Sequence, residues 1–428
     1  MRSKRSSLTR AALAVSVACL LPPSPCRAGS FSVLDFGAVG DGSHDDTVAV
    51  RATLAAAAAA GPSSVLFPAG FTFLTGAFNL SSDLVVEIAG TVLAWPGSEG
   101  GHYWLGPELP WFGETTTLVW QSFIHSRNAS NITLLGGGVV DGNGDAWWAC
   151  GCSGGDPASA PCLGYDRPRL VHTVFGSGLT IRDLTFRNSP MWNLRPSWFD
   201  NVHITNVTIL SPISSPNKRG CNTDGIDPDC VQDAIIEDSY ISVGDDAIAV
   251  KSGLDWLGRQ YGRPSRNITF RNMRIGEREK REVRGGRRHP PRTSSHQAWG
   301  RQTKWASVHT HPHMLPSTRA GTGHGISIGS EMSGGVQDIL FENFILNGTE
   351  MGPRIKSERG RGSAVQNVTF RNITLYNVGS AFQITEVRRR VTVQTSGGAV
   401  TLPAHARVGL YLTRARVGAP VPATWSRI

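Results

Sequence analysis

Short segments in which apolar and polar residues alternate recur along the chain between about residue 128 and residue 376. Apolar residues, many of them β-branched, occupy every second position in each segment, as half-buried β-strands require. Gly, Asn, Asp or Pro follows each segment, and these residues favour turns. We therefore predict an all-β chain. The segments are 131–134, 179–186, 202–209, 234–241, 267–270, 338–341 and 367–375.

The spacing of these segments predicts how they are arranged. No helical pattern separates them, and their starts recur at similar intervals, at Leu179, Val202, Ala234, Asn267, Asp338 and Asn367. A chain that repeats one unit at such intervals stacks each turn on the last and buries a continuous core. We expect a single-stranded right-handed parallel β-helix. A β-sandwich is the alternative, but it would show shorter, even spacing and more two-residue hairpins.

Three regions depart from this rhythm. The step from Asn267 to Asp338 is more than twice as long as the steps on either side of it, and removing 277–319 restores the rhythm. That segment is rich in Arg, His and Pro, and we interpret it as an insertion, either a disordered surface loop or translated non-coding sequence. Residues 387–428 form an atypical C-terminal tail, so the predicted β-helix domain covers residues 29–386. Near the N-terminus, the alanine run 55–60 predicts a short helix that could cap the open end of the solenoid.

Residues 1–28 have the pattern of a secretory signal peptide. A basic start is followed by the apolar stretch 11–21 and by the small-residue cleavage site Cys26-Arg27-Ala28. The apolar stretch is too short to anchor the chain, and no later segment is apolar for long enough to span a bilayer. We therefore expect a mature chain that begins near Gly29, is secreted to the cell wall and has no membrane partner.

The formal net charge of +9 is unevenly distributed. Segments 277–319 and 387–428 each carry +7 and segment 1–27 carries +5, which leaves the remaining chain near −10. A basic protein often binds nucleic acid. Here the positive charge lies in the irregular segments, so we expect no nucleic-acid partner.

Five cysteines remain after the signal peptide, and an oxidising compartment allows them to form disulfides. Cys221 and Cys230 bracket a candidate catalytic loop, so a bridge between them is the first choice. Cys150 and Cys152 lie near Cys162 without a histidine, which favours a loop with a disulfide over a metal site. The odd number leaves at least one thiol over or requires an intermolecular bond.

Eight N-glycosylation sequons accompany these cysteines, as expected of a secreted glycoprotein. Several fall within the strand segments, where the asparagine can simply serve a turn. The sequon asparagines are Asn79, Asn128, Asn131, Asn206, Asn267, Asn347, Asn367 and Asn372.

Three carboxylates form the first candidate catalytic group. The step from Asp224 to Asp245 is close to one coil of a solenoid, so Asp224, Asp245 and Asp246 converge on one surface. Glycoside hydrolysis needs such a group, because one carboxyl protonates the leaving oxygen while another activates water. Neighbouring strand residues point to opposite faces, so the pair must be bent at Gly244. A Ca²⁺ site or a plain Asp-rich turn is the alternative.

Two further motifs supply a histidine and cations. His324 has glycine on both sides, which permits close approach of a ligand, and lies about one coil beyond the aspartates once the insertion is removed. Arg354 and Lys356 share one face of a strand whose other face carries Ile355. These cations suit the carboxylate of an acidic sugar. Taken alone, a solvated pair of cations would explain them equally well.

Together the motifs resemble the polygalacturonases of glycoside hydrolase family 28. The resemblance covers about residues 31–276 and 320–386. It rests first on Asn222-Thr-Asp-Gly-Ile-Asp, Gly244-Asp-Asp, Gly323-His-Gly and Arg354-Ile-Lys, in that order. The plant branch is indicated by Asp35-Phe-Gly-Ala-Val-Gly-Asp-Gly, Asn188-Ser-Pro-Met-Trp-Asn and Gly329-Ser-Glu-Met-Ser-Gly-Gly.

The resemblance implies a pectin lyase-like solenoid and inverting hydrolysis of α-1,4-galacturonan, by a monomer without cofactor or metal. By that analogy Asp245 is the general acid and His324 assists it, while Asp224 and Asp246 hold and deprotonate the water. The same analogy assigns the binding of the pectin chain to Asn222, Arg354 and Lys356.

The chain also departs from the family pattern. The family continues with further coils after about Thr385, and its substrate-binding tyrosine has no counterpart here, because Tyr376 lies in a different context. An inactive pectin-binding homologue or a truncated gene product is therefore an alternative function. Hydrolysis of rhamnogalacturonan or xylogalacturonan and Ca²⁺-dependent pectate lysis are the others.

Overall fold

The computed structural model describes residues 29–108, 118–152, 154–212, 220–277, 323–357, 360–386, 389–393, 400–401 and 406–410. The predicted signal peptide, most of the predicted insertion and most of the C-terminal tail lie outside these residues.

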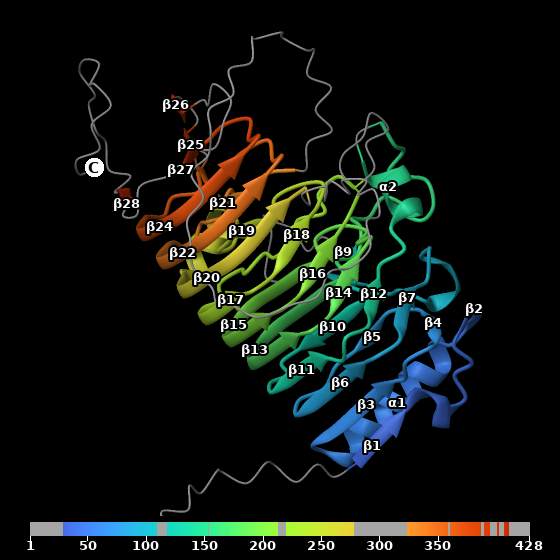
Figure 1. The fold of residues 1–428 in the computed structure, drawn as a ribbon. Helices are drawn as coiled ribbons and strands as arrows, with labels where there is room; N and C mark the ends of the chain where they lie inside the picture. Colours follow the sequence, from blue (N-terminus) through green and yellow to red (C-terminus); the bar gives the residue numbers. More distant parts are fainter. Residues whose placement is uncertain are drawn as a thin grey trace, which may run out of the picture.

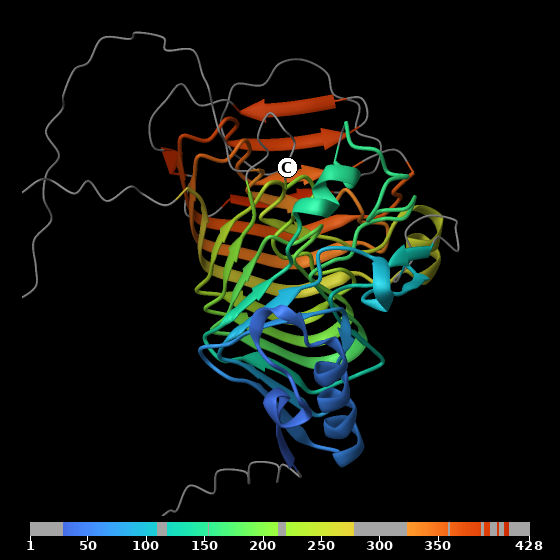
Figure 2. The same cartoon turned by 90° about the vertical axis from the view of Figure 1, so that its right-hand side faces the viewer.

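Successive turns of the chain stack in parallel and form a right-handed parallel β-helix, as the alternation predicted (Figures 1 and 2). The first apolar position of each repeat pairs with that of the next in register, from Leu179 through Val202 and Ala234 to Ile268. Ile268 pairs in turn with Ile339, so the long step in the sequence joins two neighbouring coils. The parallel pairing excludes the β-sandwich.

The strands make three faces. The first face contains β1 (Gly29–Ser32), β3 (Ser63–Phe67), β6 (Leu84–Ile88), β11 (Ile132–Leu135), β13 (Val171–Arg182), β15 (Leu194–Thr205), β17 (Gln232–Glu237), β20 (Ser265–Gly276), β22 (Val336–Asn347) and β24 (Val365–Tyr376). The second contains β2 (Asp41–Asp45), β4 (Thr72–Thr75), β7 (Thr91–Ala94), β12 (Val139–Asp141), β14 (Thr185–Arg187), β16 (Thr208–Leu210), β18 (Tyr240–Ser242) and the ends of β20, β22 and β24.

The third face carries the predicted site, and we call it the site face. It contains β5 (Phe78–Asn79), β10 (Ile124–Arg127), the first halves of β13 and β15, β19 (Ile248–Val250), β21 (Ile326–Ile328), β23 (Arg354–Lys356) and β25 (Phe382–Glu386). The remaining described elements are β8 (Leu105–Pro107), β9 (Leu118–Trp120), β26 (Arg389–Val393), β27 (Val400–Thr401), β28 (Ala406–Leu410), α1 (Thr47–Ala60), α2 (Asp145–Gly151), α3 (Asp255–Tyr261) and the 3-10 turns η1 (Val33–Phe36) and η2 (Glu99–Gly101).

Asparagine and aspartate turn the chain between the first two faces and at the start of the first. Both residues tolerate the left-handed conformation, and at these turns their side chains stack from coil to coil. Asn267 Nδ2 donates to Asp233 Oδ1 at 2.6 Å, and Asn272 Nδ2 donates to Asp238 Oδ1 at 2.9 Å. Five sequon asparagines donate in the same way, so they serve turns: Asn131, Asn206, Asn267, Asn367 and Asn372.

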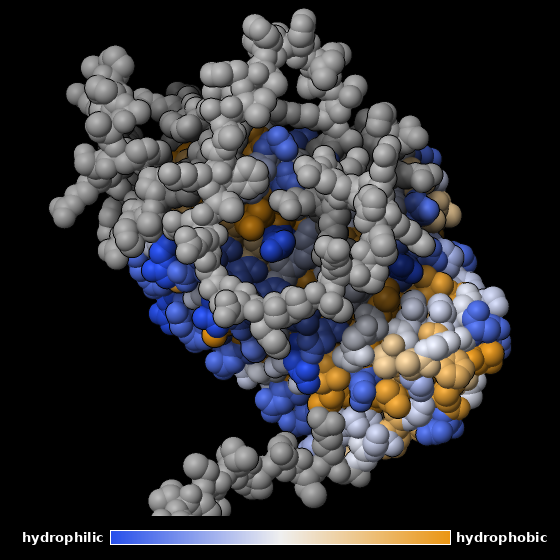
Figure 3. All heavy atoms as spheres, in the orientation of Figure 1, coloured by the Kyte–Doolittle hydropathy of each residue, from blue (hydrophilic) through white to orange (hydrophobic). Residues whose placement is uncertain are grey.

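The inward-facing positions fill the coil interior with apolar side chains, because every second residue of each strand points there. Phe341 is completely buried and stacks on Phe270 and Phe370, with ring centroids 4.9 and 5.0 Å apart. These spacings match the separation of paired strands. The outer edge over β13, β15, β17 and β20 is hydrophilic (Figure 3).

Helix α1 lies at the N-terminal end of the stack, where the alanine run predicted a capping helix (Figure 1). Val50, Leu54 and Ala57 are buried against the first coils. At the other end, β26 pairs with β25, and β27 and β28 pair with β24, all antiparallel. Among the described residues, every helix is too short or too polar to cross a bilayer.

The predicted bridge between Cys221 and Cys230 is wrong. The structure contains Cys150–Cys162, which confirms a disulfide in that loop, and Cys152–Cys221, while Cys230 is a buried free thiol. Residues 226–229 between the two predicted partners pair with the next coil as extended chain. Extended chain advances about 3.3 Å per residue, whereas bridged Cα atoms lie within about 7 Å.

Loss of the Cys152–Cys221 bridge should destabilise the protein more than loss of Cys150–Cys162. The first closes a sequence separation of 69 and the second one of only 12, and a longer closed loop restricts the unfolded chain more. We expect Cys152→Ser/Cys221→Ser to lower the free energy of unfolding by about 2–4 kcal/mol in urea titrations. Cys150→Ser/Cys162→Ser is the matched control, and a larger loss in that control would contradict the prediction.

Candidate active site

The four predicted motifs lie on successive coils of the site face. Ile226 bridges to Ile248, Ile248 pairs with Ile326, and Ser327 pairs with Arg354. These pairings place the Asp224 loop, the Asp245–Asp246 turn, His324 and β23 next to one another. The step from the first motif to the second is therefore one coil, and His324 lies one coil beyond the aspartates, as predicted.

The chain bends at Gly244 and Asp245, which confirms the predicted break in the strand. A Cβ atom on Gly244 would lie 2.1 Å from the carbonyl oxygen of Gly220, so only glycine fits there. Because of the bend, side-chain atoms of Asp245, Asp246 and His324 all lie within 4.8 Å of one another.

Asp246 is buried and held by cations. Its Oδ1 accepts hydrogen bonds from Arg354 Nη2 at 2.6 Å and Ser327 Oγ at 2.8 Å, and its Oδ2 accepts from Lys356 Nζ at 2.6 Å. Burial opposes ionisation, but Lys356, His324 and Arg354 outweigh it and hold the pKa of Asp246 well below its usual range. The two cations predicted to bind substrate therefore also keep this carboxyl ionised.

His324 lies between the carboxylates. Its Nδ1 is 3.5 Å from Asp245 Oδ1 and 3.3 Å from Asp246 Oδ1, and its Nε2 is 3.3 Å from Glu350 Oε2. Burial and Arg354 oppose the charged imidazolium, but hydrogen bonds to Asp245 and Asp246 raise the pKa of His324 to about 9. This shift favours the protonated ring at neutral pH, against the 2.9 Å contact between its Nδ1 and Arg354 Nη2.

The contribution of His324 to stability should fall with rising pH. Its folded-state pKa of about 9 lies above the unfolded value of about 6.5. Its stabilisation is thus complete below about pH 6.5 and is lost as the pH rises to about 9. Urea unfolding of the parent and of His324→Gln at pH 6 and pH 9 measures this. The difference between the two proteins should shrink by about 2–3 kcal/mol, and a constant difference would exclude a charged His324.

Asp224 is buried beside a second charged group that the sequence did not single out. Lys251 Nζ lies 3.7 Å from Asp224 Oδ2 and 3.7 Å from Asp227 Oδ2, and it donates to Glu331 Oε2 at 3.0 Å. Burial raises the pKa of Asp224 well above its usual range, and the pKa of Asp227 to about 7. The sequence did contain one sign of this group, because Lys251 directly follows the apolar strand β19. A charge buried at such a position needs an ion-pair partner.

Asn222 approaches the same carboxylates from the loop that precedes them. Its Nδ2 donates to Asp245 Oδ2 at 3.4 Å, and its Oδ1 accepts from Arg167 Nη2 at 2.9 Å. Arg167 also donates to the carbonyl oxygen of Cys221 at 3.0 Å. This buried arginine, together with the Cys152–Cys221 disulfide, fixes the loop, and nothing in the sequence pattern pointed to it.

Asp245, Asp246 and His324 are the one group of potential metal ligands that lie together among the described residues. Their surroundings do not suit a metal ion. Arg354 and Lys356 already neutralise Asp246, and the raised pKa of His324 keeps a proton on the ring that a metal would have to displace.

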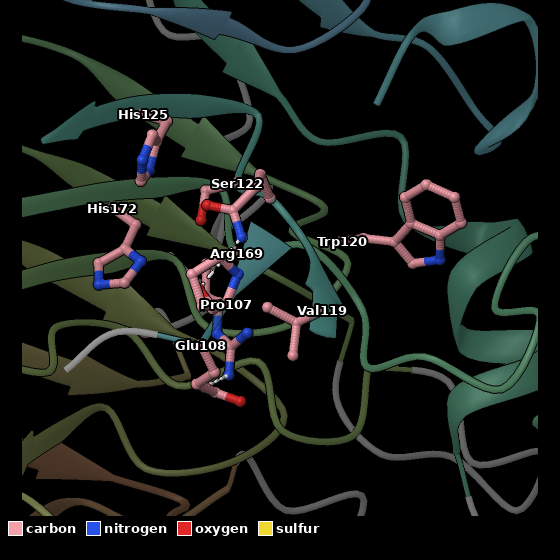
Figure 4. A pocket seen from close by; sticks show the side chains of 9 residues that line it. Pro107, Glu108, Val119, Trp120, Ser122, His125, Arg169 and His172 are labelled. Carbon is pink, nitrogen blue, oxygen red and sulfur yellow. Dashed lines mark hydrogen bonds and ion pairs between the residues drawn. The ribbon is translucent and has the colours of Figure 1, made fainter. Parts of the chain in front are cut away.

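The site face continues toward the N-terminus with buried polar side chains (Figure 4). His125 and His172 lie on paired strands, and Arg169 is paired with Glu108 across a narrow cavity. Burial lowers the pKa of His125 to about 4 and holds the pKa of His172 well below its usual range, so both rings are neutral at neutral pH. This end of the face therefore combines two neutral imidazole rings with the Arg169–Glu108 ion pair, whereas the other end carries Asp224, Asp245 and Asp246.

Two plant proteins are similar to this chain over most of its length. A probable polygalacturonase of Vitis vinifera is 31% identical over 367 residues, covering 84% of this chain and 63% of the relative. A polygalacturonase of Juniperus ashei is 26% identical over 366 residues, which cover 83% of this chain and 56% of the relative. The chain thus spans less than two thirds of the length of these plant relatives.

The fold is shared with solved structures. The crystal structure of a hyperthermoactive exopolygalacturonase from Thermotoga maritima superposes with a TM-score of 0.62 at 20% identity, covering 89% of this chain and 95% of that one. A model of rhamnogalacturonase A/epimerase, pectate lyase-like, matches residues 30–85. A model of glycosyl hydrolases family 28 matches residues 58–277 and 314–395, which is more than half of the chain. The chain therefore belongs to glycosyl hydrolases family 28.

Proposed function

We propose that this protein is a secreted polygalacturonase that hydrolyses the α-1,4 bonds of galacturonan with inversion. The observation that carries the proposal is the meeting of Asp224, Asp245, Asp246 and His324 with two cations on one face. Family membership and the plant relatives, which are described as polygalacturonases, support this substrate class.

In this mechanism Asp245 protonates the leaving oxygen. Its side chain is 27% exposed, so it can reach a bound chain, whereas Asp224 and Asp246 are buried. His324 Nδ1 lies 3.5 Å from Asp245 Oδ1 and assists the acid by holding its carboxyl group in place through a hydrogen bond. General acid catalysis requires such a group within reach of the oxygen that it protonates.

Asp224 and Asp246 position and deprotonate the attacking water. Among the described residues, Asp224 Oδ1 has no hydrogen-bond partner, so this oxygen can accept a proton from water. The pKa of Asp224 is raised, so the ionised carboxylate of Asp224 is a stronger base than that of Asp246. Inversion requires the acid and base carboxyls to lie about 6.5–9.5 Å apart, which leaves room for the water. Asp246 has an oxygen within 4.8 Å of Asp245, so in this mechanism Asp246 holds the water and Asp224 takes its proton.

The cations provide the selectivity for an acidic sugar. The side chain of Lys356 is 23% exposed, and Arg354 lies beside it on β23. A galacturonate carboxylate can share these donors with Asp246, and Asn222 contributes a polar contact on the preceding coil. The substrate is therefore a polyanionic pectin chain, and the enzyme works as a monomer without cofactor or metal.

Release of reducing ends tests this function. The purified parent should release them from polygalacturonate, more slowly from rhamnogalacturonan and xylogalacturonan, and without the ultraviolet-absorbing product of a lyase. Faster release from a branched polymer would reassign the substrate, and an absorbing product would assign lysis. A folded parent that binds pectin without releasing reducing ends would establish an inactive homologue.

A further inference from the structure

We propose that Lys251 is a positioning residue of this active site. It holds Asp224 and Asp227 in place and favours their ionised forms, and Glu331 weakens this effect because it shares the same ammonium group. The role rests on the proposed hydrolysis and adds residues to it that no motif of the resemblance assigns to catalysis.

The geometry around the ammonium group is that of a shared counter-ion. Lys251 is 2% exposed, and its Nζ lies 3.7 Å from one oxygen of Asp224, 3.7 Å from one oxygen of Asp227 and 3.0 Å from Glu331. It also lies 4.4 Å from the ring centroid of Trp192, which covers one side of the amine. Three carboxylates from two segments, Asp224 and Asp227 from one and Glu331 from the other, therefore meet one buried cation.

The other cations near the cluster belong to other carboxylates. Arg195 pairs with Asp229 at 2.8 Å, and Lys356 pairs with Asp246 at 2.6 Å. Among the described residues, Lys251 is the one cation within 4.0 Å of Asp224. The charged groups that face the cluster from the surrounding strands and loops are Asp229, Asp245, Asp246, Arg167, Arg195 and Lys356.

This arrangement links the ionisation of the two aspartates to Lys251. Burial raises the pKa of both aspartates and the lysine opposes it, while the carboxylates raise the pKa of Lys251 well above its usual range. Removing the cation raises the pKa of Asp224 and Asp227 further. Neutralising Glu331 removes a negative charge and leaves the amine to the two aspartates, which lowers their pKa.

The two substitutions should therefore move the pH profile in opposite directions. Because the base must be ionised, the acid limb of kcat/KM on polygalacturonate reports the pKa of this pair. We expect Lys251→Met to shift this limb upward by about one pH unit, which lowers kcat/KM about tenfold at any fixed pH on the limb. Glu331→Gln should shift the limb to lower pH. Lys251→Arg should restore the parental limb, because it keeps the charge.

Arg271→Met is the matched control, because Arg271 forms an exposed ion pair with Glu237 on another face. An acid limb of Lys251→Met that coincides with that of the parent overturns the proposal. So does a shift of both variants in the same direction, which would indicate a merely structural role.

A second readout separates this proposal from the proposed function. If the parent releases no reducing ends, the function is wrong, and the charge cluster is tested by urea unfolding between pH 5 and pH 8. The stability that Lys251→Met loses relative to the parent should grow with pH, because the aspartates ionise without their counter-ion. A loss that is independent of pH overturns the assignment of Lys251.

Discussion

Asp245→Asn should lower kcat on polygalacturonate by about 10³-fold and leave KM nearly unchanged. An amide keeps the shape of the side chain and cannot donate the proton that the leaving oxygen needs, and general acids typically contribute 10²–10⁴-fold. Steady-state release of reducing ends measures both constants. A KM that rises while kcat holds would indicate that Asp245 binds substrate and does not protonate it.

Asp338→Asn is the matched control for that substitution. Asp338 is an exposed turn residue, and asparagine occupies the equivalent turn position on the coils before and after it, at Asn267 and Asn367. The control should keep parental activity and stability. An equal loss of activity in both variants would attribute the effect of Asp245→Asn to folding.

Phe341→Ala should lower the free energy of unfolding by about 3–5 kcal/mol, the usual cost of removing a buried phenylalanine. Phe341 is fully buried in a stack with Phe270 and Phe370, so the truncation leaves a cavity that neighbouring coils cannot close. Urea titration followed by circular dichroism measures the loss.

Ile345→Ala provides the comparison on the same strand. Ile345 is 38% exposed, so its truncation removes little buried surface and should cost less than about 1 kcal/mol. Similar losses at both positions would contradict the assignment of inward and outward faces on β22.

The fold was predictable because one physical pattern is repeated in almost every coil. Alternation sets which side chains enter the core, and Asn or Asp at the turns sets where each strand ends. The register from Leu179 to Val202 and onward follows the sequence spacing directly. That regularity also exposed the long step between Ile268 and Ile339 as a single step between neighbouring coils.

The site was predictable where neighbouring coils fix the distance between motifs. A step of one coil brought Asp224 beside Asp245, and the glycine before Asp245 marked the bend. Contacts between side chains left no such signal. We expected Arg354 and Lys356 to bind the substrate only. In the structure both donate hydrogen bonds to Asp246.

The sequence misled where proximity along the chain was taken for proximity in space. Cys221 and Cys230 are close in sequence but lie at the two ends of an extended segment, and Cys152 reaches Cys221 from a distant loop. Lys251 and Arg167 were missed for a related reason. A buried cation is recognisable only when its partners, here from several separate loops, are known.

Proton NMR of the first product tests the central claim most directly. Digestion of polygalacturonate by the parent, followed from the first minutes, should show the β-anomer of the new reducing end before mutarotation, because water attacks opposite the leaving group. Asp245→Asn should give no such signal. An initial α-anomer or an unsaturated product from the folded parent would contradict the inverting carboxylate site.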